Sequence, residues 1–88
     1  MGLQSHMLRI ERVQNGGHTT VTVTGRLSGP WVGELERSLG ESRSTDIVVL
    51  DLTDVSFVDR EGIEFLRMLR RLKLADLRCS AFVAEQIS

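Results

Sequence analysis

The residues best suited to chemistry in this chain are Asp59, Arg60 and Glu61, which stand together in the segment DVSFVDREGIEFL. Two carboxylates at this spacing can perform acid–base chemistry when a pocket raises one pKa and a third group assists. The same charges could instead bind an anion or form a docking surface for a protein. The helices and strands predicted around these residues are needed to choose between the three interpretations.

The surrounding sequence offers little support for catalysis. No histidine lies nearby, and there is neither a glycine-rich phosphate loop nor a G-x-S-x-G nucleophile motif. A helix start explains the cluster more simply, because Asp59 would cap free N–H groups and Glu61 suits the positive end of the helix dipole. Arg60 stands four residues before Glu64, the spacing of a helical ion pair. We therefore expect no enzyme activity and no catalytic residue.

Composition excludes several other function classes. The 88 residues are 41% hydrophobic and 26% charged, with a formal net charge of −1, which is typical of a globular domain. This charge balance and the 5% aromatic content argue against nucleic-acid binding. No apolar run approaches the roughly 20 residues of a membrane-spanning helix. The single Cys79 indicates a reducing, cytoplasmic environment, and one cysteine with two histidines excludes the usual zinc sites. We expect no metal and no other cofactor.

The chain is short enough for a single domain. Its first six residues resemble a leader left by a cloning vector, with Ser-His-Met at the junction. We therefore expect a leader at residues 1–6 and one folded domain at residues 7–88. A domain of this size buries only about 60% of its unfolded surface, so every apolar face must be used.

The N-terminal half predicts a β-hairpin followed by a helix. Residues 7–25 contain two apolar-alternating stretches around QNGGH, whose Asn-Gly pair is typical of a hairpin turn. Val21 and Val23 fall on one face of the second strand. A helix is expected from Pro30, which suits the first helical position, to about Gly40. Its apolar side chains recur every four residues, at Trp31, Leu35 and Leu39.

The C-terminal half predicts strand, helix, strand and helix. The run DIVVLDL indicates a central strand, and TDVSFVD is expected to lead the chain away from it. REGIEFLRMLRRLKL, residues 60–74, has a helical apolar period, and DLRCS and AFVAEQIS predict a short strand and helix. The apolar face of the longer helix comprises Ile63, Phe65, Leu66, Leu69 and Leu72. Right-handed crossovers then give an α/β fold of order β-β-α-β-α-β-α, a mixed sheet with helices packed mainly on one face.

Together these segments resemble the STAS domain, the fold shared by anti-sigma factor antagonists and the cytoplasmic tails of sulfate transporters. VTVTGRLSGPWVGELERSL is similar to the family's strand, Gly-x-Leu turn and first helix. IVVLDLTDVSFVDREGIEFL is similar to its central strand and switch loop, and LRCSAFVAEQI to its closing strand and helix. The resemblance covers nearly all of residues 7–88 and implies a STAS-like mixed sheet.

The resemblance also implies a function for the loop before the second helix. In the antagonists, a partner kinase that is itself the anti-sigma factor phosphorylates a Ser or Thr there, and phosphate ends binding. The family loop reads Asp-Ser-Ser-Gly or Asp-Ser-Thr-Gly. Asp59 and Gly62 match this pattern, whereas Arg60 replaces the first hydroxyl residue and Glu61 replaces the phosphoacceptor. Glu61 has no hydroxyl, and its charge only partly mimics the roughly −1.5 to −2 of a phosphoserine.

Two interpretations of Glu61 follow. The domain is either locked in a state resembling the phosphorylated one, or it docks on other partners without a phosphorylation switch. The second departure from the pattern, at Arg60, favours docking without a switch. The resemblance thus implies a non-catalytic regulatory module that binds a protein partner. The expected partner-binding residues are Leu27, Ser28, Asp54, Ser56, Asp59, Arg60, Glu61, Gly62 and Ile63.

The partner is expected to be a switch-kinase-type anti-sigma factor, which would make this a bacterial transcription regulator. The alternative is the ATPase of a membrane transporter, with this domain as a small STAS subunit that does not insert into the membrane. Binding of a nucleotide or small ligand ranks lower, because Asp59 and Glu61 would repel phosphate. A homodimer is a further possibility, because an edge strand of the sheet can pair with the same strand of a second copy.

Overall fold

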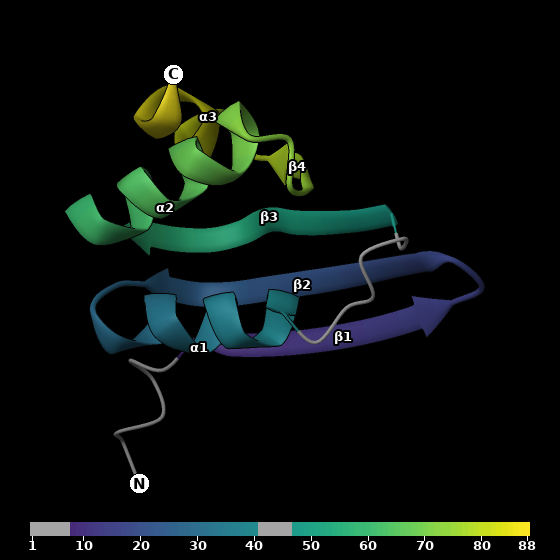
Figure 1. Cartoon of the computed structure of the whole chain (residues 1–88). Coiled ribbons are helices and arrows are strands. Elements are labelled where there is room, and N and C mark those ends of the chain that lie inside the picture. The colour runs from purple at the N-terminus through teal and green to yellow at the C-terminus, as the bar shows by residue number, and fades with distance from the viewer. Residues whose placement is uncertain (1–7, 41–46) are drawn as a thin grey trace, which may run out of the picture.

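The computed structural model describes residues 8–40 and 47–88, which form one four-stranded sheet and three helices (Figure 1). The strands are β1 (Arg9–Asn15), β2 (His18–Leu27), β3 (Ile47–Val58) and β4 (Asp76–Cys79). The helices are α1 (Pro30–Gly40), α2 (Arg60–Arg71) and α3 (Ala81–Ile87). The predicted element order is confirmed. The proposed leader at residues 1–6 lies outside the described residues.

The sheet is mixed, with the strand order β1-β2-β3-β4. β1 and β2 form the predicted antiparallel hairpin, in which Asn15 pairs with His18. Gly16 has a φ of +65° in the two-residue turn between them, a conformation that glycine adopts without a steric penalty. β2, β3 and β4 are parallel neighbours because α1 and α2 return the chain to the same end of the sheet between them.

The hydrophobic core lies on one face of the sheet. In the strand register, Val21 lies opposite Leu50 and Leu27 opposite Val58, and none of these four side chains is more than 6% exposed. All three helices contribute to the same cluster, so they cover this face, as predicted. The buried members are Leu8, Val21, Val23, Leu27, Leu35, Leu50, Leu52, Val55, Val58, Phe65, Leu66, Leu69, Val83 and Ile87. The alternate strand positions point to the opposite face, which we call the open face.

Strand β3 is longer than the sequence predicts, because the segment TDVSFV continues the strand to Val58 instead of leaving the sheet. The register with β2 shifts twice, after Asp51 and after Val55. Each shift places an extra residue in β3, so the inward positions move from Leu52 to Val55 to Val58 in steps of three. The two bulges therefore keep these side chains in the core and end the strand next to Asp59.

Helix α2 ends at Arg71, whereas the apolar period predicted an end at residue 74. Lys73 adopts a left-handed φ of +55°, and the N–H of Leu74 donates to the carbonyl of Leu69 at 3.0 Å. These features close the C-terminus of the helix. Leu72 follows the last helical residue and is 55% exposed, so the prediction that it joins the apolar face was wrong.

Candidate functional site

The charged cluster lies where β3 joins α2, beside the turn that connects β2 to α1. Because β2 and β3 are parallel neighbours, their C-terminal ends meet at the same edge of the sheet (Figure 1). The N–H of Asp59 donates to the carbonyl of Leu27 at 3.1 Å, which fixes the two junctions together. The site is therefore built from two segments that are remote in the sequence.

The carboxylate of Asp59 holds this arrangement in place. Its Oδ1 accepts a hydrogen bond from the N–H of Gly62 at 2.9 Å, as the predicted helix cap requires. Its Oδ2 accepts a second bond, also 2.9 Å long, from the N–H of Gly29 in the β2–α1 turn. Both oxygens are thus engaged in structural bonds, which favours a structural role for this half-buried residue over a catalytic one.

Gly62 is buried where α2 crosses the end of β2. A Cβ atom at this position would lie 2.7 Å from Cγ1 of Val58 and 2.8 Å from the carbonyl oxygen of Leu27. These distances leave no room for any side chain without a shift of the backbone. The small residue therefore allows the first turn of α2 to pack closely on the β2–α1 junction.

Arg60 and Glu61 project from this fixed base. Both are exposed, and Arg60 Nε lies 3.8 Å from Glu64 Oε2, which confirms the ion pair expected from their spacing. The side chains of Arg60 and Glu64 are 92% and 67% exposed, so the pair contributes little to stability. These charges are accessible to a binding partner.

The other predicted partner-binding residues differ in exposure. Asp54 and Ser56 are exposed on β3, and the Ser56 hydroxyl donates to the carbonyl of Gly25 at 3.2 Å. Ser28 is half-buried, as is Ile63, which packs against the core. Leu27 is fully buried, like Gly62, so these two residues support the surface from beneath.

Sequence reasoning missed two residues near the site. The N–H of Gly29 donates to Asp59, and Gly29 has a φ of +50°, a conformation that favours glycine. The Gly-Pro pair before α1 was the sequence feature that could have predicted a turn at this residue. Phe57 is 37% exposed on the open face, with the Arg26 guanidinium 4.3 Å from its ring centre. The outward position of Phe57 follows from the second register shift of β3, which simple alternation does not reveal.

Two titratable side chains of the described residues, Asp51 and Cys79, have shifted pKa values. Hydrogen bonds from the Thr53 hydroxyl and N–H lower the pKa of Asp51, a carboxylate on the interior strand β3. Burial raises the pKa of the Cys79 thiol, which disfavours the nucleophilic thiolate. Residues 8–40 and 47–88 hold no group of three or more His, Cys, Asp or Glu side chains that could bind a metal.

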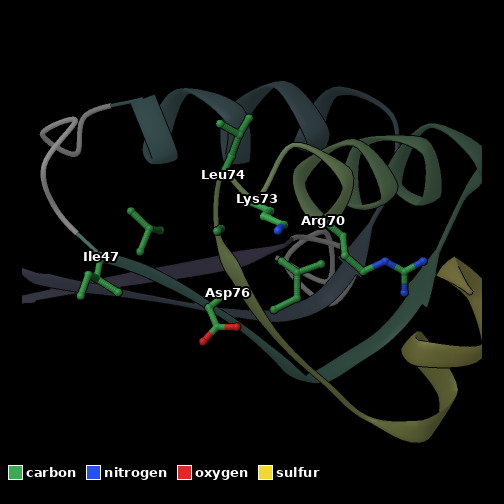
Figure 2. Close-up of a pocket in the computed structure, with 8 residues that line it drawn as sticks. Ile47, Arg70, Lys73, Leu74 and Asp76 are labelled. Atoms are coloured by element: carbon green, nitrogen blue, oxygen red, sulfur yellow. The ribbon is translucent and has the colours of Figure 1, made fainter.

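A pocket of about 620 Å³ lies at the other end of α2, away from the charged loop. Apolar side chains from the start of β3 and the α2–β4 turn line it, with Arg70, Lys73 and Asp76 as the charged members. Figure 2 shows the Arg70 side chain directed toward α3, where it donates to the Ile87 carbonyl at 2.9 Å. Arg70 is bonded to Ile87, and the negative charge of Asp76 balances the positive charge of Lys73. The described lining residues therefore do not provide the concentrated positive charge of a phosphate site.

The mixed four-stranded sheet, with helices packed over one face, places this domain in the α/β class. The STAS domain model matches residues 9–79, and the chain therefore belongs to the STAS domain family. This match confirms the resemblance drawn from the sequence. STAS domains generally act as non-enzymatic modules in protein–protein interactions. In the described part of the chain, no helix is long and apolar enough to cross a membrane.

Comparison with solved structures supports the fold. A crystal structure of the protein named Mglu superimposes with a TM-score of 0.65 at 19% sequence identity. The similarity covers 80% of this chain but only 19% of that chain, so the domain corresponds to a small part of the larger protein. At this identity the comparison shows the fold alone. The chain has no significant match among curated proteins.

Proposed function

We propose that this domain is a non-catalytic regulatory module that docks on a protein partner through the loop before α2 and the first turn of that helix. The supporting observation is the contrast between a fixed backbone and exposed charges. Asp59 and Gly62 hold the junction from within, while Arg60 and Glu61 project into solvent. A backbone ordered before binding lowers the entropic cost of association.

In our proposal, Glu61 distinguishes this module from antagonists that are switched by phosphorylation. The resemblance to their loop aligns Glu61 with the phosphoacceptor, and because Glu61 has no hydroxyl it would not accept phosphate by the usual route. We propose that it contacts a complementary cation on an ATPase partner, either a switch-kinase-type anti-sigma factor or the ATPase of a transporter. Docking would then be controlled by partner availability and not by a phosphate on this chain.

Glu61→Arg is expected to weaken partner binding by at least about tenfold, because it places a like charge against the partner's cation. Affinity capture from cytosol and solubilised membranes, followed by mass spectrometry, would identify the partner, and titration would then give Kd. Glu36→Arg is the matched control, since it makes the same charge change at an exposed position on α1. If the two variants weakened partner binding equally, the docking site would not lie in the loop before α2.

Glu61→Ser separates docking without a switch from the locked state. Our proposal expects modestly weaker binding, because one charge is lost, and no transfer of phosphate to the variant by the partner. Stronger binding, together with phosphorylation of the new hydroxyl, would instead establish that Glu61 mimics the phosphorylated state. Binding assays with and without ATP distinguish these outcomes.

A further inference from the structure

The pocket at the C-terminal end of α2 carries exposed apolar side chains. Ile47 and Leu74 both line it, and they are 54% and 55% exposed. A single exposed apolar side chain is normal on a protein surface, whereas several around one hollow indicate a surface that binds something. The volume of about 620 Å³ is large enough to receive side chains from another molecule.

Two charged side chains of opposite sign accompany this apolar lining. Lys73 and Asp76 both line the pocket and are exposed, and Figure 2 shows them with Ile47 and Leu74 around it. Within the part of the chain that the structure describes, neither Lys73 nor Asp76 forms an ion pair. Each charge is therefore available to a charge of opposite sign on another molecule.

The turn that presents these side chains is held by backbone hydrogen bonds. The N–H of Lys73 donates to the carbonyl of Arg70 at 3.2 Å, and the N–H of Leu74 donates to the carbonyl of Leu69 at 3.0 Å. These bonds fix the backbone of Lys73 and Leu74 before any partner arrives, which lowers the entropic cost of association.

A surface of this composition is complementary to itself. In a two-fold dimer, a residue that contacts a second residue of the other copy is contacted in the same way in return. Lys73 of each copy can therefore face Asp76 of the other, while the apolar linings meet between these pairs. A strongly charged partner would instead place a like charge against either Lys73 or Asp76. Charge complementarity thus favours a second copy of this chain as the occupant.

We propose that two copies of this chain associate through this pocket, with Lys73 of each copy paired with Asp76 of the other and with Ile47 and Leu74 buried between them. Asp76 begins β4, which stands last in the strand order, so the dimer also covers the start of an edge strand. Eight residues line the pocket, fewer than the roughly 20–30 a side of a stable interface. The dimer is therefore weak, with an expected Kd of about 10 µM to 1 mM.

This surface does not depend on the proposed docking loop. The pocket is built from the start of β3 and the turn after α2, whereas the loop joins the end of β3 to the start of α2. Glu61 consequently stays exposed in the dimer. A Glu61→Arg variant should dimerise like the wild type, so failure of the dimer proposal and failure of the proposed function can be told apart.

Sedimentation of the full chain over a concentration series up to about 1 mM tests the dimer. The wild type is expected to dimerise, and Leu74→Asp is expected to raise the dimer Kd at least about tenfold, because it buries a carboxylate in the apolar contact. Val13→Asp is the matched control, since Val13 is 63% exposed on β1, at the other edge of the sheet. A wild type that stays monomeric throughout, or equal effects of the two variants, would overturn the proposal.

A charge exchange tests the pairing of Lys73 with Asp76. Lys73→Asp and Asp76→Lys each place like charges opposite one another, so each should weaken the dimer at least about tenfold. Aspartate also tolerates the left-handed backbone at Lys73, which has a φ of +55°. The double variant Lys73→Asp/Asp76→Lys restores opposite charges and should dimerise like the wild type. If the double variant dimerised no better than the single variants, the two side chains would not face each other across the interface.

Discussion

Replacing Asp59 with alanine is expected to lower the free energy of unfolding by about 2–3 kcal/mol. The substitution removes the cap on α2 and the bond to Gly29, and it leaves two partly buried backbone N–H groups without an acceptor. Proteins of this kind have only about 5–15 kcal/mol of stability in total, so the loss is large. Urea unfolding, followed by the fluorescence of Trp31 and by circular dichroism, measures it.

Two further variants make this experiment specific. Asp59→Asn keeps the shape and one acceptor oxygen but turns an amide N–H₂ toward the second donor, so it should fall between the wild type and Asp59→Ala. Asp54→Ala removes an exposed carboxylate from the same part of β3 and should stay within about 0.5 kcal/mol of the wild type. If Asp59→Ala resembled Asp54→Ala, the carboxylate would not be what holds the two junctions together.

Local chemistry explains what could be predicted from the sequence. The cap of α2 joins Asp59 to Gly62, and the surface pair joins Arg60 to Glu64, so each depends on residues within one helical turn. The limits of α1 likewise follow from Pro30 and the apolar period after it. In each case the residue types and their spacing are sufficient, because the interaction spans only a few positions.

Contacts between remote segments could not be predicted in this way. The bond from Gly29 to Asp59 joins residues 30 positions apart, and only the parallel packing of β2 and β3 brings them together. Strand β3 is continuous, but its two bulges space the buried apolar residues three positions apart instead of two. Because the second half of the strand lacks the usual alternation, its sequence resembled a loop. The predicted partner surface included Leu27 for the same reason, since its burial depends on the helices that cover it.

Gly62→Ala is expected to destabilise the domain by about 1–3 kcal/mol. Alanine normally stabilises a helix relative to glycine, by about 1 kcal/mol, so helix propensity alone predicts the opposite sign. Here the added Cβ would lie 2.7 Å from Val58 Cγ1 and 2.8 Å from the Leu27 carbonyl oxygen. The Val58 methyl group has some freedom to rotate away, but the Leu27 carbonyl belongs to the backbone, so the first turn of α2 must shift.

Gly33→Ala provides the matched control, because it makes the same chemical change within α1. A Cβ atom at Gly33 would meet nothing within 4 Å, so this variant should gain up to about 1 kcal/mol. Urea unfolding of both variants therefore tests for opposite signs. Stabilisation by Gly62→Ala would mean that α2 does not pack closely on the β2–α1 turn. The exposed charges at Arg60 and Glu61 would then lack the fixed base from which we propose that they bind a partner.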